Sequence, residues 1–306
     1  MAFTAKDVQT LRERTGVGMM DCKKALTQAD GDMEKAIDIL REKGLAAAAK
    51  KASRIAAEGL VYACVDTDKK VGVVVEINSE TDFAAKSDKF QAFIAEVAQV
   101  ILETNPADVA DLLTKPCGGL TVADSLRDKI LVIGENLSIR RFVRYEGDCV
   151  AYIHGGGRIG VLVRFETEGI ADGDDKFVEC GKDVAMQIAA LNPQYLDKST
   201  VPAEDIAHER EVLMAQIQND PKMASKPEQI IAKMVDGRIG KFYENNCLLQ
   251  QAFVKDSAYT VEKYVAEVAK NLGGSLKVAE FTRFEKGEGL QKREDNFAAE
   301  VASMAK

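Results

Sequence analysis

The chain contains two edited copies of one sequence unit, and this internal repeat constrains its fold more than any other feature. Glu58-Gly59 and Val71-Gly72 recur 88 residues later as Glu146-Gly147 and Ile159-Gly160. Further echoes follow at offsets of 87 and 139 residues: Lys89-Phe90 as Lys176-Phe177, Thr121-Val122 as Thr260-Val261, and Phe142-Val143-Arg144-Tyr145-Glu146 as Phe281-Thr282-Arg283-Phe284-Glu285. Two such copies pack as paired subdomains and tend to present one long concave surface. We therefore expect a protein that grips a large partner.

Both copies show the same order of secondary-structure patterns. Alternating apolar residues indicate strands, and apolar residues three and four positions apart indicate helices. The first copy predicts strands at 61–65, 71–77 and 139–145 and helices at 87–102 and 122–133. The second predicts a hairpin at 150–167, helices at 174–191 and 260–271, and a strand at 276–284. The fold class is therefore α+β, with each copy an antiparallel three-stranded sheet backed by helices on one face.

Residues 1–54 precede the repeat and read as three short helices. Thr4 and Asp7 form a capping box for the first helix, because their side chains can satisfy free amides at its start. An apolar stripe over 33–40 marks the third helix, and Gly44 is expected to end it. This head carries eleven Lys and Arg against eight Asp and Glu, whereas the whole chain has a formal net charge of −8. A mildly basic head suits an acidic protein surface and is too weakly charged to indicate RNA.

The two copies differ by one long insertion. Ala98 and Thr121 are 23 residues apart in the first copy, whereas Ala185 and Thr260 are 75 residues apart in the second. Most of the excess reads as two helices, the second capped by Ser225, which predicts an antiparallel coiled-coil hairpin. The domains expected are a three-helix head at 1–54, core subdomain N at 55–145, core subdomain C at 146–193 and 247–286, the coiled-coil hairpin insertion at 194–246, and a C-terminal helical module at 287–306, with its helix at 297–304.

Composition narrows the class of protein. Hydrophobic residues make up 46% and charged residues 29% of the chain, which is ordinary for soluble globular proteins. No apolar run approaches the roughly 20 residues of a membrane span, and the N-terminus lacks the apolar core of a signal peptide. Six scattered cysteines without a C-x-x-C pair indicate free thiols in a reducing cytoplasm rather than a zinc site. We expect a cytoplasmic protein without direct contact to nucleic acid or membrane.

No motif assembles an enzyme or a cofactor site. Gly155, Gly157 and Gly160 match G-x-G-x-x-G in form, but they lie between two strands with no helix after them. A hairpin turn explains them better than a dinucleotide site does. His154 beside this turn could act as a base, but contact with a partner is the favoured role because no nucleophile is near it in sequence. We expect no bound metal, nucleotide or other cofactor.

Two segments suit partner binding better. Met19 and Met20 lie beside glycines at a turn between helices, where flexible apolar side chains can adapt to a partner or fill the small core, and we expect one buried and one offered. The segment Thr81-Asp82-Phe83-Ala84 follows the hairpin of the first copy only, since the second has Thr167-Glu168-Gly169-Ile170-Ala171 there. A plain helix cap with Phe83 as a hydrophobic staple is the alternative. Presence in one copy alone favours insertion of Phe83 into a pocket while Asp82 perturbs a charge or metal site.

These residues carry a resemblance to the bacterial elongation factor Ts family that runs from end to end. The motifs are Leu11-Arg12-Glu13-Arg14-Thr15-Gly16-Val17-Gly18-Met19-Met20-Asp21-Cys22-Lys23-Lys24-Ala25-Leu26, Thr81-Asp82-Phe83-Ala84-Ala85-Lys86, Ile133-Gly134-Glu135-Asn136 with Arg140-Arg141, His154 with Arg158-Ile159-Gly160-Val161, and Phe284-Glu285-Lys286-Gly287-Glu288-Gly289. Two positions depart from the family pattern: Ala84 stands where the family usually has Val, and Ala252 where it usually has Pro.

The resemblance implies a function that the residues alone do not. The family catalyses guanine-nucleotide exchange on elongation factor Tu, the GTPase that delivers aminoacyl-tRNA to the ribosome, and it meets this partner in GDP-bound and nucleotide-free forms. It implies a UBA-like head whose Arg12, Met19 and Met20 dock on the GTPase domain. It also implies that Asp82 and Phe83 push between helices near the partner's magnesium site, and that His154 grips another domain. In some relatives the hairpin supports a homodimer. The rival hypothesis is an interaction protein that holds a GTPase without exchanging its nucleotide.

Overall fold

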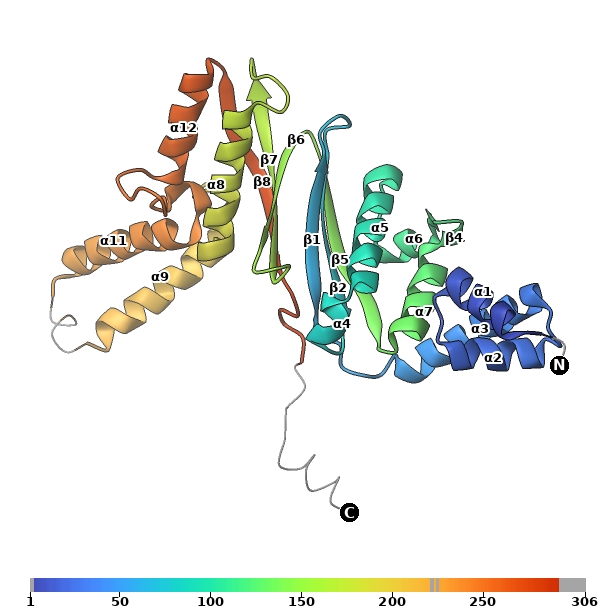
Figure 1. Cartoon of the computed structure of the whole chain (residues 1–306). Coiled ribbons are helices and arrows are strands. Elements are labelled where there is room, and N and C mark those ends of the chain that lie inside the picture. Colours follow the sequence, from blue (N-terminus) through green and yellow to red (C-terminus); the bar gives the residue numbers. More distant parts are fainter. Residues whose placement is uncertain (1–2, 221–222, 224–225, 292–306) are drawn as a thin grey trace.

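Two antiparallel three-stranded sheets form the centre of the molecule in a computed structural model that describes residues 3–220, 223 and 226–291. The first sheet has the order β1-β2-β5 and the second β6-β7-β8. Their strands are β1 (Glu58–Asp66), β2 (Val71–Ser79), β5 (Leu137–Glu146), β6 (Asp148–His154), β7 (Ile159–Glu168) and β8 (Ser275–Glu285). The sheets face each other and helices cover their outer faces (Figure 1). This mixed helix and sheet architecture confirms the α+β class.

Each sheet has its own apolar core with the helices that cover it. On the first sheet, α5 (Asp88–Thr104) and α7 (Val122–Ile133) bury large side chains such as Phe90 and Phe93. On the second, α8 (Asp175–Leu191) and α12 (Val261–Leu272) take the same places. Between α5 and α7 the chain adds a short helix, α6 (Val109–Thr114), and a small hairpin of β3 (Pro116–Cys117) and β4 (Leu120–Thr121). The sequence patterns predicted neither of these additions.

The interface between the sheets is a third, thinner apolar layer that depends on two repeat-related glycines. Its buried members are Val61, Ala63, Val74, Cys149, Leu162 and Phe284. A Cβ atom on Gly72 would lie 2.6 Å from Leu162 Cδ1, and one on Gly160 would lie 2.4 Å from Val61 Cγ1. Both distances are shorter than van der Waals contact, so the two sheets can approach this closely only because glycine stands at both positions.

The head consists of α1 (Ala5–Thr15), α2 (Met19–Gln28) and α3 (Met33–Lys51). The expected capping box is present, because Thr4 accepts from Asp7 N and Asp7 accepts from Thr4 N. The expectation that Gly44 ends the third helix was wrong, since α3 continues to Lys51. Gly44 is buried in that helix, where a Cβ would lie 3.8 Å from Arg127 O of α7. One glycine costs a helix only about 1 kcal/mol, and here it lets α3 pack closely on the body.

The long insertion forms α9 (Ala203–Gln218) and α11 (Glu228–Asn246), followed by the 3-10 turn η1 (Leu248–Gln250). The two helices share an apolar seam of Leu213, Ile217, Val235 and Ile239. Figure 1 shows them at one end of the molecule and the head at the other. The proposed Ser225 cap and the C-terminal helix at 297–304 both lie outside the described residues, and α11 begins after Pro227 without a side-chain cap. Among the helices that are described, none has the length and apolar character needed to cross a membrane.

Candidate functional site

The segment between β2 and α5 folds as a separate short helix, α4 (Asp82–Lys86). Thr81 caps its start by accepting a hydrogen bond from Ala84 N, and Ser87 caps the start of α5 by accepting from Phe90 N. The helix cap of the alternative hypothesis is therefore present. The hydrophobic staple of that hypothesis is absent, because the Phe83 side chain is 85% exposed. A large aromatic ring in this position is available to a partner.

Asp82 lies next to this exposed ring and is ionised. Its carboxylate accepts a hydrogen bond from Lys86 Nζ at 2.6 Å, one helical turn further on. That hydrogen bond and the positive charge of Lys86 hold the pKa of Asp82 below its usual range. The Lys86 side chain is largely exposed and the Asp82 side chain is about half exposed. The start of α4 therefore carries an exposed aromatic ring and a carboxylate at neighbouring positions, the carboxylate being paired with Lys86.

The base of α4 is fixed by contacts that the sequence patterns did not reveal. Ala84 and Ala85, which belong to α4, are buried. Glu135, in the turn between α7 and β5, accepts hydrogen bonds from both the backbone N–H and the hydroxyl of Thr81. One available signal was Ala84 itself, because it occupies the position where a local capping box needs an acid.

A buried carboxylate joins the end of the second repeat to this region. Glu76 of β2 is fully buried and accepts hydrogen bonds from Arg140, Arg141 and the backbone N–H of Gly287. Burial would by itself raise the pKa of Glu76, but the hydrogen bonds from Gly287, Asn78 and Arg141 outweigh it and lower that pKa. The chain that leaves β8 is thereby held on the same subdomain as α4.

The two methionines of the head are both at the surface. Met19 is 51% and Met20 63% exposed at the start of α2, so the expectation that one would be buried was wrong. The core-facing positions of α2 belong to residues further along the helix, namely Cys22, Ala25 and Leu26. Arg12 of α1 is exposed as well. The head therefore presents two flexible apolar side chains and a cation.

His154 lies exposed at the end of β6, beside the turn to β7. Tyr152 Oη and His154 Nδ1 are 3.1 Å apart and share a hydrogen bond. The glycine-rich turn packs on the first subdomain, since Val61 N donates to Gly157 O at 2.8 Å. These glycines therefore shape a hairpin turn that joins the two sheets, and no helix follows them as a dinucleotide site would require.

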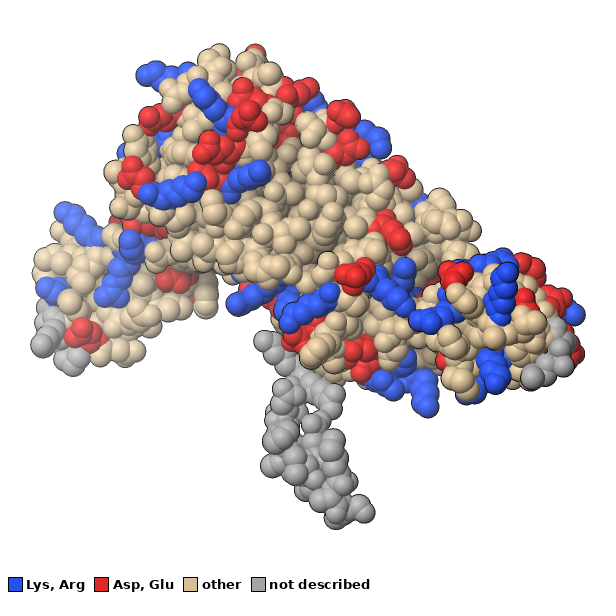
Figure 2. Space-filling model, in the orientation of Figure 1, with Lys and Arg blue, Asp and Glu red and all other residues tan. Residues whose placement is uncertain are grey.

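The elements that carry these residues lie along one side of the molecule. Figure 1 shows α2, α4 and the turn between β6 and β7 along its lower edge. In the space-filling view of Figure 2, Lys and Arg are mixed with Asp and Glu along the lower edge of the body and on the head, whereas the middle of the body carries few charges. An extended surface with exposed apolar side chains among charges of both signs suits a large protein partner better than a small molecule.

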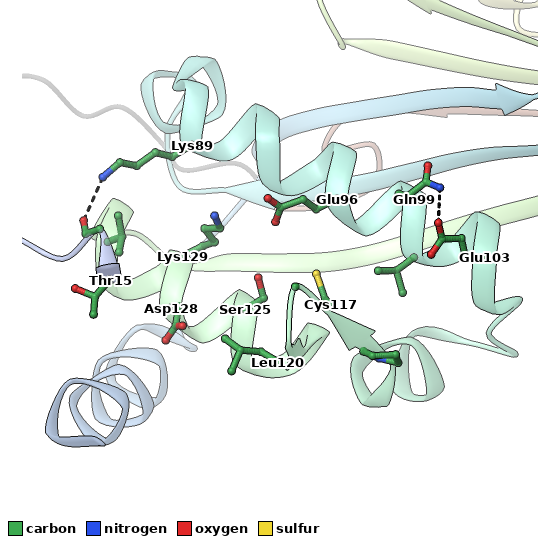
Figure 3. Close-up of a pocket in the computed structure, with 15 residues that line it drawn as sticks. Thr15, Lys89, Glu96, Gln99, Glu103, Cys117, Leu120, Ser125, Asp128 and Lys129 are labelled. Atoms are coloured by element: carbon green, nitrogen blue, oxygen red, sulfur yellow. Dashed lines mark hydrogen bonds between the residues drawn. The ribbon is translucent and has the colours of Figure 1, made fainter. Parts of the chain in front are cut away.

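A candidate cavity of the first repeat lies elsewhere. It has a volume of about 600 Å³ and lies between α5, α7, the β3–β4 hairpin and the end of α1. Figure 3 shows Lys89 reaching from α5 to the head, where its Nζ lies 3.4 Å from Gly16 O. None of the predicted site residues lines this cavity. In the part of the chain that the structure describes, no group of His, Cys, Asp and Glu could hold a metal ion.

Comparison with known proteins shows to which family the chain is similar. The family model "Elongation factor TS" matches residues 80–288, which include α4, the β6–β7 turn and the long insertion. The chain belongs to the elongation factor Ts family. Elongation factor Ts of Clostridioides difficile (strain 630) is 52% identical over 307 residues, with 99% of each chain covered. That of Clostridium perfringens (strain SM101 / Type A) is 49% identical over 306 residues, with 99% of each covered.

A third relative is similar over the same length. Elongation factor Ts of Trichlorobacter lovleyi (strain ATCC BAA-1151 / DSM 17278 / SZ) is 48% identical over 313 residues, covering 100% of this chain and 99% of the relative. Because near-complete coverage includes residues before position 80, the head is part of the likeness as well as the repeats. Membership of the elongation factor Ts family therefore concerns the whole described architecture, as the sequence motifs indicated.

Proposed function

We propose that this protein is a guanine-nucleotide exchange factor for elongation factor Tu and acts during translation elongation in the cytoplasm. Membership of the elongation factor Ts family supports this role. The observation that carries the mechanism is Phe83, which is 85% exposed beside an ionised Asp82 on a helix that only one of the two repeats has. A side chain held in this way can enter a pocket of the partner, and a repeat used only for packing would have no need of it.

The mechanism we propose is coupled binding. Magnesium and the phosphate-binding loop hold GDP together in a GTPase. Insertion of Phe83 between helices of the partner, with the Asp82 carboxylate near the metal, favours a state that binds the exchange factor well and GDP poorly. Linkage then requires that nucleotide weaken the grip of the exchange factor, so that GTP binding completes the cycle. The protein performs no covalent chemistry in this scheme.

The remaining surface residues supply affinity. Arg12, Met19 and Met20 of a UBA-like head would dock on the GTPase domain, since adaptable methionines suit a surface that must fit two partner conformations. His154 would contact a second domain of the partner. We propose the same domain division as the sequence analysis, with a head, two core subdomains and a coiled-coil hairpin formed by α9 and α11. We propose this hairpin as the surface of a homodimer, which sedimentation of the purified protein would test.

The deciding experiment is release of a fluorescent GDP from purified elongation factor Tu, with and without this protein in catalytic amounts. Acceleration that is lost in the Asp82→Ala, Phe83→Ala double variant would support the proposal. We expect Phe83→Ala alone to lower the maximal exchange rate about 30-fold, which corresponds to the roughly 2 kcal/mol of a buried aromatic anchor. Its affinity for nucleotide-free partner should fall much less.

The rival function is a passive interaction protein that holds the GTPase. Equal losses of binding and exchange rate in Phe83→Ala would favour it, and binding without any acceleration by the wild type would establish it. The matched control is His154→Ala, which removes a proposed contact far from the nucleotide. We expect that variant to weaken binding while leaving the maximal exchange rate nearly unchanged, because uniform binding does not alter a saturated rate.

A further inference from the structure

The helix that carries Phe83 is too short to hold its own direction. α4 has 5 residues, barely more than one turn. Isolated helices of this length are unstable in water because the first turn costs more conformational entropy than its hydrogen bonds return. Phe83 itself is too exposed to be held by packing. The direction of its ring therefore depends on whatever fixes the backbone at the start of α4.

Two other helices of the chain show how such a start is normally fixed. In α1 and in α7 a threonine before the helix accepts from the third helical residue, and the aspartate there accepts from the threonine N–H. The pairs are Thr4 with Asp7 and Thr121 with Asp124. At the start of α4 the first half is present, since Thr81 Oγ1 accepts from Ala84 N at 3.2 Å. The second half cannot form locally, because alanine has no carboxylate.

Glu135 completes this box from another part of the chain. Its carboxylate accepts from Thr81 N at 3.0 Å and from Thr81 Oγ1 at 2.6 Å. Hydrogen bonds to an ionised acceptor are stronger than neutral ones, and two of them on one residue fix its orientation as well as its place. The start of α4 is therefore set by the turn between α7 and β5, which lies 54 residues further along the chain.

A second carboxylate joins the same two segments, but it lies before α4 and accepts from the α7–β5 turn. Glu80 accepts from the backbone N–H of Asn136 at 2.7 Å and pairs with Arg54 at 3.3 Å. The Asn136 side chain donates in turn to Arg54 O at 2.9 Å. Arg54 lies just beyond α3, the last helix of the head. Glu80 and Glu135 thus form a crossed pair that ties together the α4 loop, the α7–β5 turn and the chain leaving the head.

We propose that Glu135 is a positioning residue for nucleotide exchange: by closing the capping box of α4 from the α7–β5 turn, it holds Phe83 in the direction needed for insertion. This inference rests on the proposed exchange function. Glu135 acts through Thr81 and the α4 backbone rather than through the nucleotide. Its removal should therefore reduce the maximal exchange rate while the affinity for the partner, which the wider surface supplies, remains nearly the same.

The test compares Glu135→Ala and Glu135→Gln in the fluorescent GDP release assay at saturating exchange factor. We expect Glu135→Ala to lower the maximal rate about tenfold, because a misplacement of about 1 Å is enough to cost a factor of that order or more. Glu135→Gln should recover part of the rate, since its carbonyl can still accept one of the two hydrogen bonds. An unchanged maximal rate in Glu135→Ala would overturn the proposal.

The matched control is Asp174→Ala. Asp174 caps α8 in the second repeat by accepting from Lys176 N and Phe177 N, so its loss also removes a carboxylate from a helix start. We expect a similar fall in thermal stability but an unchanged exchange rate. An equal loss of rate in this control would show that Glu135→Ala acts through general destabilisation, which would overturn the positioning role.

A double-mutant cycle separates positioning from direct contact. If Glu135 acts only by aiming Phe83, adding Glu135→Ala to Phe83→Ala should change the exchange rate less than twofold, because coupled residues are not additive. A full tenfold loss in that background would mean an independent role and would overturn the proposal.

Hydrogen exchange in the free protein distinguishes failure of this inference from failure of the exchange function. In Glu135→Ala the amides of Thr81 and Ala84 should exchange faster with solvent, whereas those of β2 should not change. If the wild type did not accelerate GDP release, the exchange function would be overturned, and with it the role of Glu135 in exchange. Unchanged protection of both amides would overturn the proposal that Glu135 fixes the start of α4, even in an active exchange factor.

Discussion

The two repeats share a scaffold and differ in what they attach to it. Both sheets have an irregularity at the same repeat position, between Glu76 and Ile77 in the first and between Arg164 and Phe165 in the second. Both also place a glycine of the repeated motif at the contact between the sheets, Gly72 in one and Gly160 in the other. Features that serve packing have thus been kept in both copies.

The charges at the shared irregularity are inverted between the copies. In the first repeat Glu76 of β2 pairs across the sheet with Arg141 of β5. In the second, Arg164 of β7 pairs with Glu280 of β8 at the equivalent place. The first pair has a fully buried carboxylate, whereas both partners of the second are partly exposed. The same cross-strand contact therefore became a buried anchor in one copy and a surface ion pair in the other.

The attachments differ most where function is proposed. After β2 the first repeat inserts α4 with its exposed Phe83, whereas β7 leads to α8 through a loop without a helix. Conversely, the second repeat inserts α9 and α11 where the first has only α6 and a two-stranded hairpin. A duplicated scaffold can supply two rigid sheets and leave each copy free to carry a different projection. The proposed division of labour is displacement of nucleotide by one copy and grip by the other.

The difference between the two ion pairs is tested most directly by removing one charged side chain from each pair. We expect Glu76→Ala to cost about 3–5 kcal/mol of unfolding free energy, because it leaves two arginines and the Gly287 N–H without their shared partner. Arg164→Ala should cost less than about 1 kcal/mol, as partly exposed pairs do. Urea unfolding at neutral pH measures both. Equal losses would mean that burial does not distinguish the copies.

The buried pair of the first repeat should make its own contribution to the pH dependence of stability. The pKa of Glu76 is lowered in the folded protein, so its contribution is complete above the unfolded value, about 4.3, and is lost as the pH falls through the lower folded value. The difference in unfolding free energy between wild type and Glu76→Gln should therefore shrink below about pH 4.3. Urea titrations at neutral and acidic pH would measure it, and a constant difference would refute the assignment.

The shared glycines should be indispensable in both copies. A Cβ on Gly160 would lie 2.4 Å from Val61 Cγ1, and one on Gly72 would lie 2.8 Å from Cys149 Cβ. We expect either change to alanine to lower the unfolding free energy by about 1–3 kcal/mol, the usual cost of overpacking. Thermal unfolding followed by circular dichroism is the measurement. A neutral result at one position would show that the sheets are not equally close at the two sites.

The smallest effect is expected in the insertion that only the second repeat has. Gly237 lies within α11, and a Cβ there would meet nothing within 4 Å. Gly237→Ala should therefore stabilise the protein by about 0.5–1 kcal/mol, because alanine loses less backbone entropy in a helix. It serves as the control for the sheet glycines, since the same substitution has opposite signs where space is open and where it is filled. Destabilisation here would contradict the open environment of α11.

The sequence predicted the repeated scaffold well, and the reason is visible in its residues. The helix expected at 122–133 is α7 (Val122–Ile133), because Thr121 and Asp124 make a local capping box and Gly134 takes a positive φ at the other end. Strands expected at 61–65 and 71–77 lie within β1 and β2. Periodicity and caps are local signals, so a single chain displays them. The α6 helix and the β3–β4 hairpin are too short to show a period.

Other misses concern residues whose role depends on how the segments pack. Gly44 looked like a helix end, but it lies inside α3, where α7 packs against it. Met19 and Met20 could not be assigned to core or surface until Cys22, Ala25 and Leu26 of α2 were seen to fill the core. Glu135 was visible only as part of a family motif. Its bond to Thr81 joins residues 54 positions apart, which no window of sequence can reveal.

The sequence by itself therefore determined the duplicated α+β plan, the single Asp82-Phe83 pair and the family, since each of these is written in local patterns or in their repetition. Only the tertiary structure decided which way Phe83 faces, that Glu76 is buried and Arg164 is not, and that Glu135 closes the start of α4. The physical reason is that periodicity records what a segment needs to bury. Direction, burial of charge and long-range hydrogen bonds are settled only when separate segments come together.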